Sequence, residues 1–391
     1  MRDILDTLLR EWRAGETVGV GTVVRTFKSA PQDPGAAMLV TASGEAAGSV
    51  SGGCVEGAVY ALAEDAIGGA PPVLERYGIS DDDAFAVGLT CGGILDVFVE
   101  SVSRTTFPDL EEVADDIAAG RPVAVATVIE HVDPQRVGRR LVVRPDRVTG
   151  TLGGELADER VGDDARGLLA GGLTTTLVRG PDGERMGDGM RVFVNSFAPA
   201  PRLIVFGAID FASALASLGG FLGYRVTVCD AREVFATRAR FPDVDDLVVD
   251  WPDRYLTAQI EEGLIDERTV LCVLTHDPKF DVPVLTAALR GPRVAYIGAM
   301  GSRRTHDDRM RRLREAGLTD DELARIHSPI GLDLGARTPE ETAVSIGAQL
   351  IALRWGGTGD DLSAREGPIH GTVQPPPDAI PLVGERSVPG R

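Results

Sequence analysis

Two cysteines each stand beside a pair of glycines: Cys54 follows Gly52–Gly53, and Cys91 precedes Gly92–Gly93. Cys54 falls near the start of a predicted helix, where the helix dipole favours a thiolate. Glycines allow a bulky ligand to come close to the backbone, and two thiolates can bind a soft metal centre or exchange sulfur. The same pattern is more often that of small buried residues in tight turns, and the residues alone leave both interpretations open.

A second candidate site is a phosphate-binding turn of the dinucleotide type. The G-x-G-x-x-G/A pattern is matched by Gly207 and Ala212, but its middle glycine, which lets the backbone approach a pyrophosphate, is Ile209. Asp210 competes with a phosphate for the field of the helix N-terminus. Asp230 stands about where a ribose-binding acid belongs. The turn therefore predicts a Rossmann-like domain more firmly than it predicts NAD(P) binding.

Two further turns follow predicted strands of the same region, where ligands bind in parallel sheets. One contains His276, and the other combines a hydroxyl, two guanidinium groups and backbone amides at the start of a helix. The second combination predicts an anion seat, although an ordinary N-cap beside surface arginines explains it equally well. The candidate cofactor-binding residues of this turn are Gly301, Ser302, Arg303, Arg304 and Thr305.

The elements that must position these residues fall into two parts. Residues 1–197 combine helices with β-branched strands, which predicts an α+β domain. After the Pro-rich segment 198–201, residues 202–355 alternate strands and helices, which predicts a Rossmann-like, doubly wound parallel sheet. Its last helix carries a capping signature that begins at Thr338. Residues 356–391 are rich in Gly, Pro and charge and predict a disordered tail. No internal repeat is evident.

Composition narrows the classes of function. The formal net charge of −19 argues against a nucleic-acid partner, because such a surface repels phosphates. No apolar run approaches the roughly 18 residues of a membrane span, and acids interrupt the first helix, so we expect a cytoplasmic protein without a signal peptide. The four cysteines form no C-x-x-C pair, which predicts no metal site of that type. They are also too few for two [2Fe–2S] clusters, which need about eight thiolates.

Ordered stretches in both parts resemble the XdhC/CoxI family, the accessory factors of xanthine dehydrogenase and related molybdenum hydroxylases. In the N-terminal part, the resemblance lies in Gly48-Ser-Val-Ser-Gly-Gly-Cys54-Val-Glu56 and in Cys91-Gly-Gly93. In the C-terminal part, it lies in Thr275-His-Asp-Pro-Lys279, Gly298-Ala-Met-Gly-Ser-Arg-Arg-Thr305 and Ile330-Gly-Leu-Asp-Leu-Gly-Ala-Arg-Thr-Pro-Glu-Glu341.

The resemblance implies an XdhC/CoxI-type domain followed by a Rossmann domain, commonly as a homodimer. It implies a factor that binds and protects molybdenum cofactor (molybdopterin), assists its sulfuration from a sulfur donor and delivers it to a hydroxylase apoenzyme. Cys54 and Cys91 would then face the molybdenum dithiolene or its sulfur, and Arg303 and Arg304 would hold a phosphate. This favours a maturation chaperone over a catalyst, although such proteins can carry the name xanthine dehydrogenase by association.

Two other functions stay open at this point. One is a small NAD(P)-dependent oxidoreductase, which would need a usable nucleotide turn, yet members of the family usually carry glycine at the position of Ile209. The other is a non-catalytic scaffold whose Rossmann domain only docks a partner.

Overall fold

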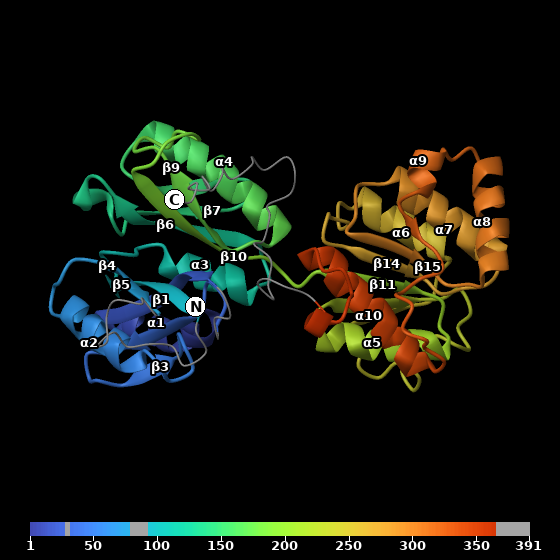
Figure 1. Cartoon of the computed structure of the whole chain (residues 1–391), viewed down its shortest axis with the longest axis horizontal. Helices are drawn as coiled ribbons and strands as arrows, with labels where there is room; N and C mark the ends of the chain where they lie inside the picture. The colour runs from blue at the N-terminus through green and yellow to red at the C-terminus, as the bar shows by residue number, and fades with distance from the viewer. Residues whose placement is uncertain (28–31, 79–92, 365–391) are drawn as a thin grey trace. The chain divides into compact units, whose positions relative to one another are not determined.

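A computed structural model describes residues 1–27, 32–78 and 93–364 of the chain. The chain forms two compact units, one ending at Pro199 and one beginning at Ala200 (Figure 1). Within the described residues, the N-terminal unit contains two five-stranded antiparallel sheets, and the C-terminal unit contains one six-stranded parallel sheet. The predicted α/β fold class, with a Rossmann-like parallel sheet after an α+β part, is confirmed.

The N-terminal unit consists of two successive halves. The first half has the sheet order β3-β2-β1-β5-β4. Its elements are η1 (Arg2–Ile4), α1 (Leu5–Ala14), β1 (Val18–Phe27), β2 (Ala37–Val40), β3 (Ala46–Gly48), α2 (Glu56–Ile67), β4 (Val73–Tyr77) and β5 (Ile94–Val102). The second half has the order β8-β7-β6-β10-β9. Its elements are α3 (Leu110–Ala118), β6 (Val123–His131), η2 (Pro134–Arg136), β7 (Arg140–Val143), β8 (Val148–Thr151), α4 (Glu155–Gly171), β9 (Thr175–Arg179) and β10 (Met190–Phe197).

The two halves have the same topology. Each runs helix, three strands, helix and two strands, and each sheet places its first strand in the centre, between the second and the fifth. Contacts between the halves are reciprocal, since β1 contacts β9 and β4 contacts β6, as an approximate two-fold relation requires. The expectation that the chain has no internal repeat is therefore wrong. Topology depends on the pattern of buried positions, which persists while the exposed residues diverge.

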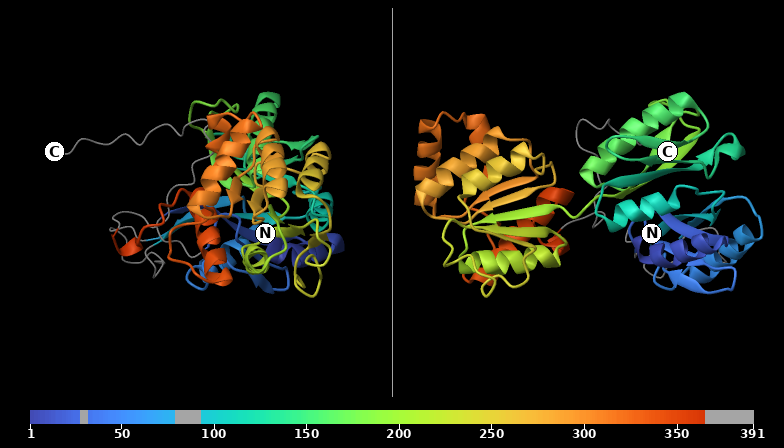
Figure 2. Two further views of the ribbon diagram at one scale, coloured as in Figure 1. Left: turned by 90° about the vertical axis from the view of Figure 1, so that its right-hand side faces the viewer. Right: turned by 180° about the vertical axis from the view of Figure 1, so that it is seen from behind.

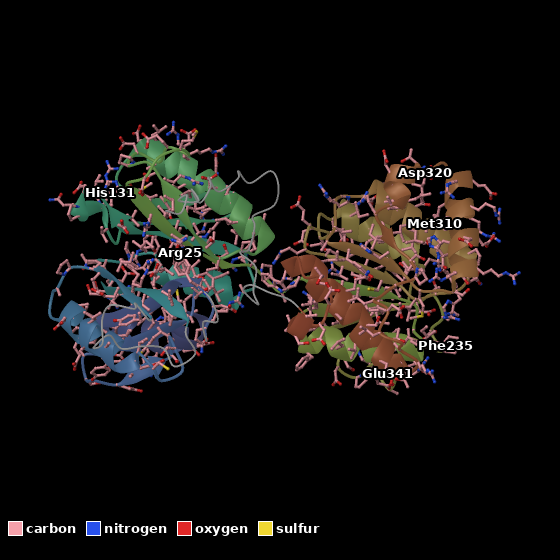
Figure 3. The ribbon with its side chains drawn as sticks, viewed as in Figure 1. Arg25, His131, Phe235, Met310, Asp320 and Glu341 are labelled. Atoms are coloured by element: carbon pink, nitrogen blue, oxygen red, sulfur yellow. The ribbon has the colours of Figure 1, made fainter. Side chains whose placement is uncertain are left out.

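A small buried cluster lies where the two sheets meet. Val24 of β1 and Phe98 of β5 pack there with their counterparts, Ile129 of β6 and Phe193 of β10. Figure 3 labels Arg25, the neighbour of Val24, at this junction, and Figure 2 shows the two layers from behind. The cluster takes one residue from each strand of two equivalent pairs, β1 with β6 and β5 with β10, so the two-fold relation extends to the packing.

The C-terminal unit has the strand order β13-β12-β11-β14-β15-β16, with every pair parallel. Its elements are β11 (Arg202–Phe206), α5 (Asp210–Phe221), β12 (Arg225–Cys229), β13 (Asp246–Val248), α6 (Pro252–Glu261), β14 (Val270–Val273), α7 (Pro278–Arg290), β15 (Tyr296–Ala299), α8 (Arg303–Glu315), α9 (Asp320–Leu323), β16 (Ile326–His327), α10 (Pro339–Trp355) and η3 (Leu362–Ala364).

Helices cover both faces of this sheet. Figure 1 shows α5 and α10 on one face and α6, α7 and α8 on the other. Successive side chains of β11 alternate between the faces: Leu203 packs in the cluster with α5 and α10, whereas Ile204 packs in the cluster with α6 and α7. A strand buried on both faces must be continuously apolar, which explains its Leu-Ile-Val-Phe run.

The capping signature at Thr338 is confirmed, because its side chain accepts from the Glu341 amide and the Glu341 carboxylate accepts from the Thr338 amide. Of the predicted tail, only residues 356–364 lie within the described part of the chain, and they include η3. None of the described helices is both long and apolar enough to cross a membrane.

Candidate functional site

The glycine-flanked Cys54 lies in the connection between β3 and α2, and this connection turns around the carboxylate of Glu56. Glu56 Oε1 accepts hydrogen bonds from Ser49 Oγ at 2.7 Å and from the Ser51 amide at 2.9 Å. Oε2 accepts from Ser51 Oγ at 2.5 Å and from the Gly53 amide at 2.8 Å. The first residue of the helix therefore closes the turn that precedes it.

These contacts also fix the charge of the turn. Burial raises the pKa of Glu56, but hydrogen bonds from Ser51 and Ser49 outweigh burial and lower the pKa to about 2. The carboxylate is thus ionised at neutral pH. The remaining amides of the turn are used internally as well: Gly52 donates to Ser49 Oγ, and Cys54 donates to Ser51 Oγ, both at 2.9 Å. The turn does not present these amides to an external anion.

The turn places the half-buried residue Cys54 directly after two glycines. Gly52 (φ 74°) and Gly53 (φ 119°) both adopt left-handed conformations, and a Cβ at either position would meet no atom of the described residues within 4 Å. Cys54 packs its inner side against the buried cluster between α2 and the first sheet. Cys91 and Gly92 lie outside the described residues, and Gly93 is buried just before β5. The pairing of Cys54 with Cys91 stays a prediction.

The candidate residues of the C-terminal unit follow one edge of the parallel sheet. The register pairs Phe206 with Cys229 and with Val273, and Val273 with Ala299, so the four strands end level with one another. Gly207 comes directly after the first of these ends. Its φ is 108°, and a Cβ there would lie 2.9 Å from Thr275 Cγ2, so the close approach of two strand ends requires glycine.

Asp230 and His276 follow two more of these strand ends, and the segment from Gly301 to Thr305 follows the fourth. Asp230 is buried and accepts from the Ala208 amide at 2.7 Å, while Arg232 Nε and Nη2 reach its two oxygens at 2.9 and 2.8 Å. Contacts within the chain therefore engage both carboxylate oxygens. His276 is exposed.

The loop after β12 folds over the start of α5. Arg240 donates to Asp210 at 2.8 Å and to the Ala208 carbonyl at 3.0 Å. The ring centroid of Phe235, labelled in Figure 3, lies 4.6 Å from the Arg232 guanidinium carbon. The charge that Asp210 adds to the turn is thus paired, and a guanidinium covers the Asp230 carboxylate.

The predicted anion seat is a capped helix start. Ser302 is the N-cap of α8, and its Oγ accepts from the Thr305 amide at 3.2 Å. Arg303 and Arg304 begin the helix, and both side chains are exposed. Gly301 (φ 154°) precedes the N-cap, and a Cβ there would lie 3.0 Å from the Thr305 side chain.

A buried ion pair between Arg309 and Asp281 contacts the backbone directly before this turn. Arg309 Nη2 donates to Asp281 at 2.8 Å and to the Met300 carbonyl at 2.7 Å, and Nη1 donates to Ser328 Oγ at 3.2 Å. Thr275 Oγ1 also donates to Asp281. The side chains of Arg309 and Asp281 are only 3% and 5% exposed. Together they tie the segments that follow β14, β15 and β16.

In the sequence analysis, no role is assigned to the residues that hold the Cys54 turn and the Gly301 turn in position. Glu56 is visible in the sequence as an acid in the first turn of a predicted helix. No sequence signal marks Arg309 and Asp281, which are 28 positions apart and meet only through the fold. Cys229 and Cys272, by contrast, are fully buried in strands, as their apolar neighbours predict.

Family models match both units of the chain. One, described as the XdhC and CoxI family, matches residues 11–78 and 116–179, and another, described as the XdhC Rossmann domain, matches residues 203–350. Together they match more than half of the chain. The chain belongs to the XdhC and CoxI family.

Two related proteins match this chain over most of its length. A Bacillus subtilis (strain 168) protein whose name describes a probable xanthine dehydrogenase subunit is 28% identical over 355 residues, which is 90% of this chain and 96% of the relative. The Escherichia coli (strain K12) protein named "Molybdenum cofactor insertion chaperone PaoD" is 28% identical over 353 residues, 90% of this chain and 88% of the relative.

A solved structure shares the fold. A crystal structure from Bacillus halodurans, titled as that of a xanthine dehydrogenase, matches with a TM-score of 0.61 and 25% identity. The match covers 89% of this chain and 95% of that chain. The family indicates an accessory role in the insertion of molybdenum cofactor.

Proposed function

We propose that this protein binds molybdenum cofactor, assists its sulfuration and delivers it to the apoenzyme of a molybdenum hydroxylase. The turn at Cys54 is the observation that carries the proposal. A thiol is a suitable ligand for a soft, sulfur-bound metal centre, and the two glycines that precede Cys54 place no side chain between it and the described neighbours of the turn. The name of the Escherichia coli relative, a molybdenum cofactor insertion chaperone, supports the same cargo.

The two candidate places, one in each unit, suit ligand groups of different chemistry. Around Cys54, the amides are engaged by Glu56, Ser49 and Ser51, so the turn suits the metal end of the cofactor better than its phosphate. The start of α8 suits an anion better, because Arg303 and Arg304 are exposed there beside the positive end of a helix dipole. We therefore assign a metal-binding role to Cys54 in the N-terminal unit and, independently, an anion-binding role to Arg303 and Arg304 in the C-terminal unit.

Cofactor binding by single variants tests the assignment. We expect Cys54→Ser to weaken the binding of molybdenum cofactor and the activation of a hydroxylase apoenzyme by about tenfold or more, corresponding to ~1.4 kcal/mol. Leu156→Ser is the matched control, because Leu156 stands at the equivalent position in the second half and is 44% exposed. Unchanged binding in Cys54→Ser would remove the cysteine from the site.

Further variants separate the remaining roles. Cys91→Ser tests whether the second glycine-flanked cysteine shares the cargo with Cys54. Arg303→Ser together with Arg304→Ser tests the phosphate role, and we expect weaker binding with an unchanged sulfur content of the delivered cofactor. Sulfur content that depends on Cys54 would support assistance of sulfuration, whereas equal content in wild type and Cys54→Ser would restrict the protein to binding and delivery. Sedimentation of the wild-type protein tests the predicted homodimer.

A further inference from the structure

The internal repeat allows the Cys54 turn to be compared with a second copy of itself. One constant shift along the sequence relates the β3–α2 connection to the β8–α4 connection. Gly48 (φ 81°) and Gly150 (φ 85°) begin the two connections, and a Cβ at either one would clash with a backbone carbonyl of the neighbouring strand. The same shift pairs buried residues with buried residues: Val50 with Leu152, Val55 with Ala157, Val59 with Val161, Ala63 with Ala165, and Ala66 with Leu168.

An acid holds the turn in both copies. Glu56 accepts from the hydroxyl seven residues earlier, Ser49, at 2.7 Å and from the amide six residues earlier, Val50, at 3.3 Å. Asp158 accepts from its own hydroxyl seven residues earlier, Thr151, at 2.7 Å and from an amide six residues earlier at 2.6 Å. These two shared contacts join strand to helix and are structural, since the second copy keeps them without a cysteine.

Three contacts exist only in the first copy. Glu56 also accepts from the Ser51 amide, from Ser51 Oγ and from the Gly53 amide. Glycine (Gly153) replaces the serine in the second copy, and its amide donates to the threonine hydroxyl instead. Glutamate is one methylene longer than the aspartate of the second copy, and the longer side chain of Glu56 reaches the Gly53 amide.

Ser51 carries the effect of Glu56 to the cysteine. Its Oγ donates to Glu56 at 2.5 Å and accepts from the amides of Cys54 at 2.9 Å and Val55 at 3.0 Å. The Ser51 side chain is buried, so this hydroxyl is held from both sides. At the position of Cys54, the second copy has Leu156, which is exposed. The additional contacts of the acid therefore accompany the cysteine, as a positioning role requires.

We propose that Glu56, acting through Ser51, is the positioning residue that fixes the Cys54 turn for its cargo. The second copy retains only the two shared contacts of the acid, which are structural. The proposal rests on the proposed function for the nature of the cargo, but not for the position of the thiol.

Glu56→Asp separates the two sets of contacts, because the second copy shows that aspartate can maintain the shared ones. Asp158→Asn is the matched control for general loss of stability. In the full-length protein, the rate of Cys54 alkylation by iodoacetamide is measured by peptide mass spectrometry, alongside the urea unfolding midpoint. Both variants should lower the midpoint, but only Glu56→Asp should accelerate alkylation, by about tenfold, as the turn opens more often.

Ser51→Ala provides a second variant that leaves the acid in place, and we expect the same acceleration. The proposal is overturned if Glu56→Asp and Ser51→Ala leave the alkylation rate unchanged, or if Asp158→Asn raises it equally. Binding of molybdenum cofactor is the second readout and should weaken in Glu56→Asp but not in Asp158→Asn. If wild-type protein binds no cofactor, the proposed function fails while the alkylation rates still decide the positioning role.

Discussion

Replacing Arg309 by methionine tests the account of the buried pair beneath the Gly301 turn. Arg309→Met removes the partner of Asp281, whose side chain is only 5% exposed, and leaves an uncompensated buried carboxylate. Removal of one member of a buried pair costs about 3–5 kcal/mol. The Met300 carbonyl and Ser328 hydroxyl also lose the guanidinium, so we expect the upper half of this range.

The double variant Arg309→Met, Asp281→Leu shows whether the cost comes from the unpaired charge. With both charges gone, what remains lost is chiefly hydrogen bonds to Met300 and Thr275, about 1–3 kcal/mol in total. The double variant should therefore be more stable than Arg309→Met alone, despite the additional substitution.

Hydrogen exchange of the β14 amides (Val270–Val273) is the appropriate assay. This strand is buried at the centre of the parallel sheet, so its slowest amides report the opening of the C-terminal unit without a contribution from the N-terminal unit. The single variant Asp281→Leu completes the comparison. If the double variant loses as much free energy of unfolding as Arg309→Met and Asp281→Leu lose together, the two residues are not coupled and the reasoning is refuted.

Three further predictions concern the turns. Glu56→Gln should lower the free energy of unfolding by about 1–2 kcal/mol at pH 7. Folding lowers the Glu56 pKa from 4.5 to about 2, so the stabilisation by the carboxylate is present above pH 4.5 and should disappear as the pH falls to about 2. Urea titrations at a series of pH values measure this loss. Gly207→Ala should destabilise the C-terminal unit by about 2–4 kcal/mol in the same exchange assay, since the new Cβ clashes with Thr275. Gly52→Ala should cost only about 1 kcal/mol, because the new Cβ would meet no atom of the described residues within 4 Å, yet it should weaken cofactor binding. Equal losses of stability at the two glycines would contradict this distinction.

The parallel sheet shows what local pattern can predict. The apolar run at 203–206 predicts a strand, and β11 is found at Arg202–Phe206, because a strand covered on both faces must be an uninterrupted apolar run. The capping box at Thr338 and Glu341 was likewise readable, since its partners are three positions apart. Such features depend on neighbours in the chain.

The candidate site was readable only in part. The glycines beside Cys54 marked the turn, but not the acid that closes it or the serine that links acid and thiol. Asp230 stood at the expected distance from Gly207, whereas the pairing of Asp210 with Arg240, 30 positions later, became visible only when the loop after β12 was placed. A motif fixes where a residue lies along the chain; it does not fix which charge will be packed against it.

By itself, the sequence determined the succession of helices and strands, the parallel sheet and the family, because periodicity and ordered motifs are properties of consecutive residues. The tertiary structure decided the rest. It revealed that the two halves of the N-terminal unit are copies of one topology, because equivalence lies in which positions are buried. It also decided that Glu56 has three contacts with no counterpart around Asp158, because that difference depends on the reach of one side chain in a folded turn.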